Sequence, residues 1–253
     1  EDYTARGKII TPLKDRIGIE VRTHYPRTLE EGMAITRQEA WLARDGGSAP
    51  VHVPPFIAEA VEEVAFQARD DARVDKHSGV SQRLPISLLE NVASNAERRA
   101  LTLGEDHPIA RVSDLYAALP AVTGKLELEY EGELKGAEAV ARDIVRRAIG
   151  QAFSRVATAL DTEDVVAHFE ADNQLRVPDG VRTADLVGVF GAVPGLLDAA
   201  AGLAPGGAPD EVAAAAEFVL EGLYARKLIS RSEERGYAAP DLDAAAAPRA
   251  RWN

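Results

Sequence analysis

The chain has 253 residues, of which 46% are hydrophobic and 6% aromatic, and its mean hydropathy is −0.17. This length can hold one large or two small domains with a buried core. The formal net charge of −12 argues against a nucleic-acid-binding groove, and the lack of cysteine excludes disulfides, thiolate metal sites and cysteine nucleophiles.

The first patterned stretch, 8–26, has the sequence KIITPLKDRIGIEVRTHYP. An apolar pair broken by a proline precedes about one helical turn at 13–17, which Gly18 ends. Ile19 and Val21 then alternate with polar residues, as in a strand with one buried face. The stretch predicts a short helix tip that carries Lys, Asp and Arg, followed by a strand.

Residues 28–104 predict three helices joined by polar turns. Thr28 stands three residues before a glutamate, which is a capping-box pattern that opens the first helix. Pro55 and Pro85 mark the first turns of the second and third helices. Apolar residues recur at helical spacing along both, and Gly104 is expected to end the third.

Residues 105–230 predict a further helical region, whose most amphipathic helix runs over 136–158. Within this region the run 126–133, LELEYEGE, alternates apolar and acidic residues and predicts an exposed strand. Residues 231–253 are polar and then rich in alanine and proline, so we expect a flexible tail there.

Two short motifs resemble signatures of AAA+ ATPases of the magnesium-chelatase I-subunit and MoxR-like family. Leu13-Lys-Asp-Arg-Ile-Gly18 is similar to the tip that precedes the last strand of their nucleotide-binding core. Gly79-Val-Ser-Gln-Arg83 is similar to the Gly-x-Ser-x-Arg signature of their helical lid. The resemblance is strongest over 1–104.

The resemblance implies a mainly α fold made of several parts. Residues 1–27 would be the C-terminal end of an α/β AAA+ core, and 28–104 would be the helical lid domain. The helical region 105–230 and the tail 231–253 would follow. The chain would then be the C-terminal portion of the ATPase, without its P-loop half.

The resemblance also implies roles for two arginines. In this family the arginine of the tip is the arginine finger, which reaches the ATP of a neighbouring subunit, and the lid arginine is sensor 2. Carried over to this sequence, these are Arg16 and Arg83. A finger supplies positive charge to the transferring phosphoryl group, and the planar fork of a guanidinium suits phosphate oxygens.

ATP and Mg²⁺ are the implied cofactors of the intact protein, and none is expected to be tightly bound to these residues alone. The implied partners are further copies in a ring, a hexamer, and a protein with a von Willebrand factor A domain. The ATPase would drive metal insertion into a porphyrin or protein remodelling. Because the sequence contains no Walker A loop and no Walker B acidic pair, this chain alone is predicted not to hydrolyse ATP.

Each arginine also has a plainer interpretation. Arg16 could form a surface pair with Asp15 or Glu20, which would contribute about 0–1 kcal/mol, and Arg22 is a rival candidate for the finger. We prefer Arg16, because a helix tip can project across a subunit boundary.

The alternative for Arg83 is a loop pair with Asp75 or Glu90. Its order and distance downstream of Arg16 favour the sensor interpretation.

Other patterns carry less weight. Thr123-Gly-Lys125 imitates the tail of a P-loop but lacks the first glycine of a Walker A motif. The five histidines show no metal-ligand spacing, so no metal site is predicted. Adjacent like charges are predicted on solvated faces, namely Glu62-Glu63, Asp70-Asp71, Arg98-Arg99 and Arg146-Arg147.

No stretch approaches the run of about 18 apolar residues that a membrane span requires, and no signal peptide is visible. Together with the lack of cysteine, this predicts a cytoplasmic protein with no membrane or nucleic-acid partner. A non-enzymatic helical module for protein interaction is the alternative function.

Overall fold

The computed structural model of the chain describes residues 15–19, 21–43 and 49–240. Within these ranges the regular structure is almost entirely helical, so the predicted mainly α fold is confirmed. Two 3-10 helices, η1 (Ala157–Ala159) and η2 (Thr183–Asp185), and one antiparallel strand pair, β1 (Ser230–Ser232) and β2 (Gly236–Ala238), accompany the α-helices. The α-helices are α2 (Leu29–Glu39), α3 (Pro55–Asp70), α4 (Arg83–Leu103), α5 (Val112–Ala117), α6 (Leu119–Thr123), α7 (Tyr130–Lys135), α8 (Ala137–Val156), α9 (Glu163–Glu170), α10 (Leu186–Phe190), α11 (Leu196–Leu203) and α12 (Pro209–Ala225).

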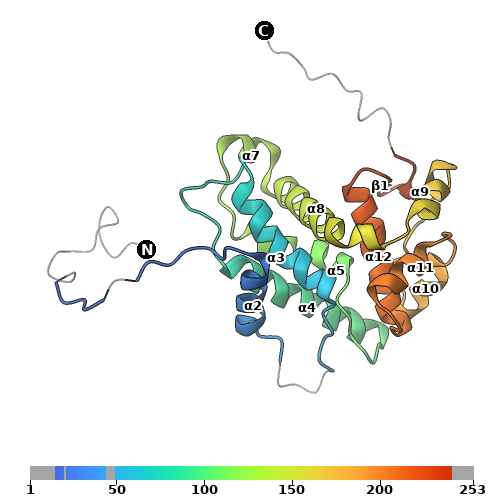
Figure 1. Cartoon of the computed structure of the whole chain (residues 1–253), viewed down its shortest axis with the longest axis horizontal. Coiled ribbons are helices and arrows are strands. Elements are labelled where there is room, and N and C mark those ends of the chain that lie inside the picture. Colours follow the sequence, from blue (N-terminus) through green and yellow to red (C-terminus); the bar gives the residue numbers. More distant parts are fainter. Residues whose placement is uncertain (1–14, 20, 44–48, 241–253) are drawn as a thin grey trace, which may run out of the picture.

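Helix α8 lies at the centre of the bundle and packs against both α3 and α12 (Figure 1). One aromatic residue from each helix meets there. Phe56 of α3 and Phe153 of α8 both contact Phe218 of α12, with ring centroids 4.8 Å and 6.0 Å from it. All three rings are buried, and such pairs add about 0.5–1.5 kcal/mol to the stabilisation from buried area. The three helices therefore share one core.

Small residues allow α12 to approach α8 closely. The run Ala213–Ala216 is completely buried, and alanine combines a high helix propensity with a short side chain. Gly222 faces the ring of Phe153, because a Cβ built on this glycine would lie 2.1 Å from the ring Cγ. A side chain at this position would have to push the two helices apart.

The helix ends follow the local signals in the sequence. Thr28 caps α2, since its Oγ1 accepts a hydrogen bond of 3.2 Å from the Glu31 N–H. The Glu31 carboxylate accepts in return from the Arg27 N–H over 2.8 Å. Gly104, with φ of +66°, ends α4 as expected. The cap and this helix end are both confirmed.

The strand expected at 126–133 is wrong, because the second half of this run forms helix α7. Only Leu128 makes a bridge of strand type, with Val74. Tyr130 in this run and Leu134 directly after it stand four positions apart, which is one face of a helix. The sequence pattern was thus compatible with both periods, and the pairing with residues 73–75 ends where the helix begins.

The strand expected after the Lys-Asp-Arg tip is also absent from the described part of the chain. Asp15 and Arg16 lie in a turn, and residues 13 and 14 lie outside the described ranges. Ile19 and Val21 are 80% and 78% exposed. Within the described ranges no neighbouring strand pairs with this segment.

The first part of the tail expected at 231–253 has regular structure instead. Strands β1 and β2 form a hairpin, and Tyr237 of β2 exchanges two backbone hydrogen bonds of 2.9 Å with Leu175. Residues 241–253 lie outside the described ranges. One hydrophobic core continues from Phe56 to Tyr237, so the boundary expected at 104/105 does not divide it.

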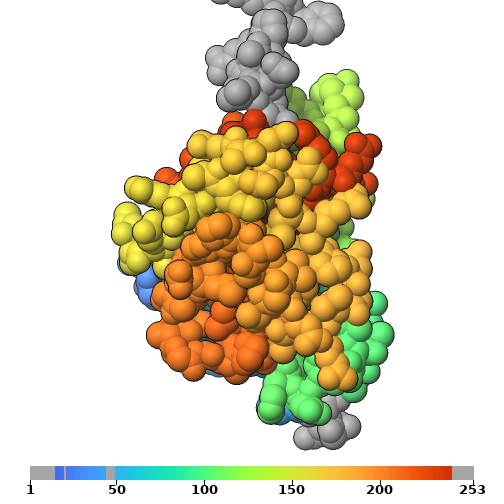
Figure 2. All heavy atoms as spheres, turned by 90° about the vertical axis from the view of Figure 1, so that its right-hand side faces the viewer, coloured from blue at the N-terminus to red at the C-terminus, as the bar shows by residue number. Residues whose placement is uncertain are grey.

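Helices α9, α10 and α11 gather at one end of the molecule, on the right in Figure 1 and toward the viewer in Figure 2. Helices α10 and α11 pack against α12, and α9 contacts β2. A search of the described helices finds none with the length and apolar character needed to cross a bilayer.

Candidate functional site

The turn that leads into Arg83 has a fixed backbone. Gly79 has φ of +69°, a conformation that favours glycine, and a Cβ there would lie 2.3 Å from the Tyr25 hydroxyl. The Val80 N–H donates to the same hydroxyl over 3.2 Å, and the Val80 side chain is buried. Gly79 and Val80 thus pack the turn against Tyr25, which belongs to the N-terminal segment.

Arg69 of α3 holds the turn from the other side. Its guanidinium stacks on the ring of Tyr25, with 4.3 Å to the ring centroid. Its Nε donates to the Val80 carbonyl over 2.9 Å, and its Nη2 donates to Gln82 Oε1 over 3.0 Å. Burial lowers the pKa of Arg69, while the nearby Glu62 carboxylate opposes the change. An arginine stays charged despite such a shift, so the turn rests on a fixed cation.

Gln82 connects α4 to α2 and α3. Its Nε2 donates to Glu62 Oε1 over 2.7 Å, to Thr36 Oγ1 over 3.1 Å and to the Gly32 carbonyl over 3.2 Å. Thr36 Oγ1 in turn donates to Glu62 Oε2 over 2.7 Å. We call Thr36, Glu62, Arg69 and Gln82 the polar cluster. It joins three helices directly beside Arg83.

Glu62 is the buried acid of the polar cluster, and its side chain has no solvent exposure. Burial raises its pKa, against the hydrogen bonds from Gln82 and Thr36 that lower it. The approach of α2 is close, since a Cβ on Gly32 would lie 2.2 Å from Glu62 Oε1. Only glycine leaves room for the carboxylate at this point.

Arg83 itself is exposed and is the first residue of α4, which is the position expected for it. Neither of the plainer pairings is present. Asp75 accepts instead from the His77 N–H over 2.7 Å, and Glu90 accepts from the Trp41 N–H over 2.9 Å. Among the described residues, none forms a hydrogen bond or ion pair with the guanidinium, which is exposed at the start of α4, while the backbone beneath it is held by buried contacts.

Arg16 lies in an exposed turn of the N-terminal segment, next to Asp15, which is also exposed. Arg22, the rival candidate, is exposed as well, and Glu20 lies outside the described ranges. The segment carrying both arginines extends away from the helices before Tyr25 meets the turn (Figure 1). No contact in the described part of the chain joins Arg16 to Arg83.

Several residues predicted on solvated faces belong to buried polar contacts. Glu62, Glu63 and Asp71 are all 5% exposed or less. Arg99 donates to Asp114 Oδ2 over 2.9 Å and to the Thr183 hydroxyl over 2.6 Å. Asp71 has one partner nearby, Arg73, but other partners lie far away in the chain, namely Arg147 for Asp71, Arg155 for Glu63 and Thr183 for Arg99. No local sequence signal identifies these distant contacts. The small residues Gly32 and Thr36, one turn apart on α2, are the sequence feature that comes closest to indicating a close contact at this position, which Glu62 makes.

Within the described ranges, no group of three or more His, Asp or Glu side chains is placed to hold a metal ion. A comparison of the chain with known protein families, with characterised proteins and with solved structures found no significant match.

Proposed function

We propose that the chain is the C-terminal, lid-bearing portion of an AAA+ ATPase of the magnesium-chelatase-like or MoxR-like type. In this proposal Arg83 is sensor 2 and Arg16 is the arginine finger. The observation that carries it is the placement of Arg83, which is exposed at the first residue of α4 on a turn fixed by Tyr25 and Arg69. A guanidinium on a rigid base can be aimed at phosphate oxygens with little loss of freedom on binding.

The N-terminal segment gives further support. Ile19 and Val21 are apolar, alternate along the chain and are largely exposed. Such residues in an extended segment are normally covered by a sheet or by a partner. As the last strand of a nucleotide-binding core, this segment would be covered by the rest of that core, and Arg16 would then lie at its edge.

The other properties of the intact protein are part of the same proposal. ATP and Mg²⁺ would bind to a P-loop half that these residues do not contain. The subunits would form a hexameric ring in the cytoplasm and act on a partner with a von Willebrand factor A domain. Metal insertion into a porphyrin and protein remodelling are equally compatible with the residues seen here.

A non-enzymatic helical interaction module is the second candidate. The observation that favours it is the continuous core from Phe56 to Tyr237. A lid that moves as a unit is expected to have a core of its own, whereas a single rigid scaffold suits a binding protein.

The test is ATP turnover by the full-length protein. Arg83→Ala should lower kcat by about tenfold or more, because the guanidinium would stabilise charge on the transferring phosphoryl group. Arg98→Ala is the matched control, since Arg98 is an exposed arginine on the same helix. Full-length protein without ATPase activity, or equal activity of the two variants, would favour the interaction module.

A further inference from the structure

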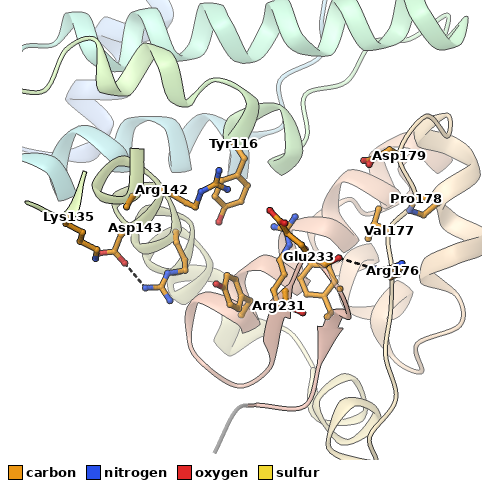
Figure 3. A pocket seen from close by; sticks show the side chains of 16 residues that line it. Tyr116, Lys135, Arg142, Asp143, Arg176, Val177, Pro178, Asp179, Arg231 and Glu233 are labelled. Atoms are coloured by element: carbon orange, nitrogen blue, oxygen red, sulfur yellow. Dashed lines mark hydrogen bonds and ion pairs between the residues drawn. The ribbon is translucent and has the colours of Figure 1, made fainter. Parts of the chain in front are cut away.

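A second candidate site lies beside α8 and shares no residue with the polar cluster. A cavity of about 1120 Å³ opens between α8, the segment 176–179 and the β1–β2 hairpin. Figure 3 shows Arg142 and Lys135 on one wall and Arg176 and Pro178 on the other, with Arg231 between them. We call it the basic cavity. Its volume is close to the upper end of the range usual for small-molecule sites, about 300–1,000 Å³, so it has room for a segment of polypeptide.

The charge of this cavity differs from that of the whole chain. Four arginines and one lysine line it, against three carboxylates. Arg231 is paired with the buried Glu221 and Arg146 with Asp143, so the cations available to a ligand are Arg142, Arg176 and Lys135, in a protein whose net charge is −12. One of the carboxylates, Asp143, also forms an ion pair of 2.7 Å with Arg73, which does not line the cavity. An acidic ligand is therefore the kind that the lining attracts.

The floor of the cavity is rigid. Glu221 is completely buried and accepts hydrogen bonds from the hydroxyls of Tyr116, over 2.9 Å, and Tyr237, over 2.6 Å. Arg231 pairs with the same carboxylate, and its guanidinium lies 5.5 Å and 5.3 Å from the centroids of the two tyrosine rings. This fixed base sets the position of Arg231 before any ligand arrives.

The walls carry cations that are only lightly held. Arg142 makes one exposed pair with Glu138, over 3.2 Å, and surface pairs of this kind are weak. Arg176 donates one hydrogen bond, of 3.1 Å, to the Glu233 carbonyl. Each guanidinium has five N–H donors, so both retain donors for a carboxylate. Val177 and Pro178 add apolar surface between the charges.

Helix α7 has the complementary character. It presents Tyr130 and Leu134, which are 72% and 71% exposed, on one face. Exposed glutamates at 129, 131 and 133 surround them. We call α7 with Glu129 the acidic knob. An exposed apolar pair ringed by like charges is typical of a helix that binds in a groove.

The acidic knob is held firmly in this exposed position. The Glu129 N–H donates to the Arg73 carbonyl over 2.9 Å. A Cβ on Gly132 would lie 2.6 Å from the same carbonyl oxygen, so the helix sits directly on the backbone at 73. In this position Tyr130 and Leu134 remain exposed.

The knob and the cavity are neighbours on one face, because Lys135 both ends α7 and lines the cavity. A two-fold contact between identical subunits requires two complementary patches placed in this way, so that each copy both gives and receives. We infer that the basic cavity receives the acidic knob of a second copy of this chain. The inference goes beyond the proposed ATPase function and does not depend on it.

The test is sedimentation of the chain without nucleotide, up to about 100 μM, which would reveal micromolar self-association. A dimer is expected, and it should weaken as salt is raised. A knob variant with Glu131→Arg and Glu133→Arg should be monomeric, and so should a cavity variant with Arg142→Glu and Arg176→Glu. Arg98→Glu reverses an exposed charge outside both the knob and the cavity, so it should leave the dimer unchanged. Circular dichroism checks that all variants are folded.

Mixing the two monomeric variants gives the decisive result. One contact then joins a reversed knob to a reversed cavity, and the other joins a native knob to a native cavity, so both are attractive. Dimers should return in the mixture alone. A monomeric native chain would overturn the inference, as would a dimer that neither variant disrupts. If the chain stays monomeric but binds a peptide of alternating glutamate and alanine, the cavity serves another acidic protein, and the inference is equally wrong.

Discussion

Gln82 donates a hydrogen bond of 2.7 Å to Glu62, so the residue next to the sensor candidate is tied to a carboxylate without solvent exposure. A turn at the surface is thus anchored in the interior of the bundle. The position of Arg83 depends on this contact, because Gln82 directly precedes it at the start of α4.

Gln82→Ala should lower the free energy of unfolding by about 1–3 kcal/mol, because it leaves the buried Glu62 carboxylate without one of its donors. Gln38→Ala is the matched control. Gln38 is exposed, and its amide donates to the neighbouring exposed Glu39 side chain, so the change should be within about 0.5 kcal/mol. Urea unfolding measures both. Equal stability of the two variants would show that the hydrogen bond to Glu62 has no net effect.

Asp71 gives a prediction with a defined pH range. The side-chain hydrogen bonds from Arg73 lower the pKa of Asp71 from its ordinary value of 3.8 to about 2. The folded state therefore favours the ionised form. This contribution is complete above the unfolded-state value and is lost as the pH falls toward 2. With allowance for solvent screening, it amounts to about 1–2 kcal/mol near neutrality.

Asp71→Asn should therefore be less stable than the native chain at pH 7, and the difference should shrink as the pH drops below 4. Asp70→Asn is the control, since Asp70 is exposed beside it. Thermal or urea unfolding across pH provides the comparison. A difference that does not change with pH would contradict the role given to the ionised Asp71.

Gly222→Ala should be strongly destabilising, by about 1–3 kcal/mol or more, because the new methyl group would overlap the Phe153 ring at 2.1 Å. Gly188→Ala in α10 should instead be neutral or stabilising by up to about 1 kcal/mol, because nothing lies within 4 Å of its Cβ position. Denaturant midpoints distinguish the two. A tolerated alanine at 222 would mean that α8 and α12 separate at little cost.

Arg16 can be tested by mixing subunits of the full-length ATPase. Arg16→Ala should lower turnover by about 10³-fold or more while nucleotide binding is nearly unchanged, because the lost contact forms in the transition state. Mixing it with subunits that lack the P-loop lysine should restore part of the activity, since some interfaces then combine an intact pocket with an intact finger. Arg83→Ala mixed with the same lysine variant should restore none, because both changes then affect one pocket. If mixed rings form but activity does not recover, Arg16 does not act on a neighbouring subunit and is a surface residue paired with Asp15.

The sequence predicted those parts of the fold that depend on local chemistry. The cap at Thr28, the proline in the first turn of α3 and the glycine that ends α4 all lie where the structure has them. Arg83 could be placed at a helix start for the same reason, although α4 begins two residues before the proline at 85 that signalled it. These signals act within one helical turn.

The polar cluster could not be predicted, because its hydrogen bonds join residues 20, 26 and 46 positions apart. Glu62 lies on a helix that is buried on nearly all sides, and its sequence neighbours do not reveal this. The hairpin at 230–238 was missed for a similar reason. Its order comes from Leu175, which pairs with Tyr237 across a large sequence distance.

The contact of Tyr25 with the Gly79 turn makes the N-terminal segment and the start of α4 one mechanical piece. The hydroxyl of Tyr25 meets the Val80 N–H, and its ring carries Arg69. A displacement of residues 21–24 would therefore reach the start of α4 through Tyr25, in addition to the route through α2 and Gln82, without involving the Phe56–Phe218 core. Tyr25→Phe would remove the hydrogen bond to the Val80 N–H but keep the ring on which Arg69 stacks, so it would loosen this connection without disturbing the rest of the bundle.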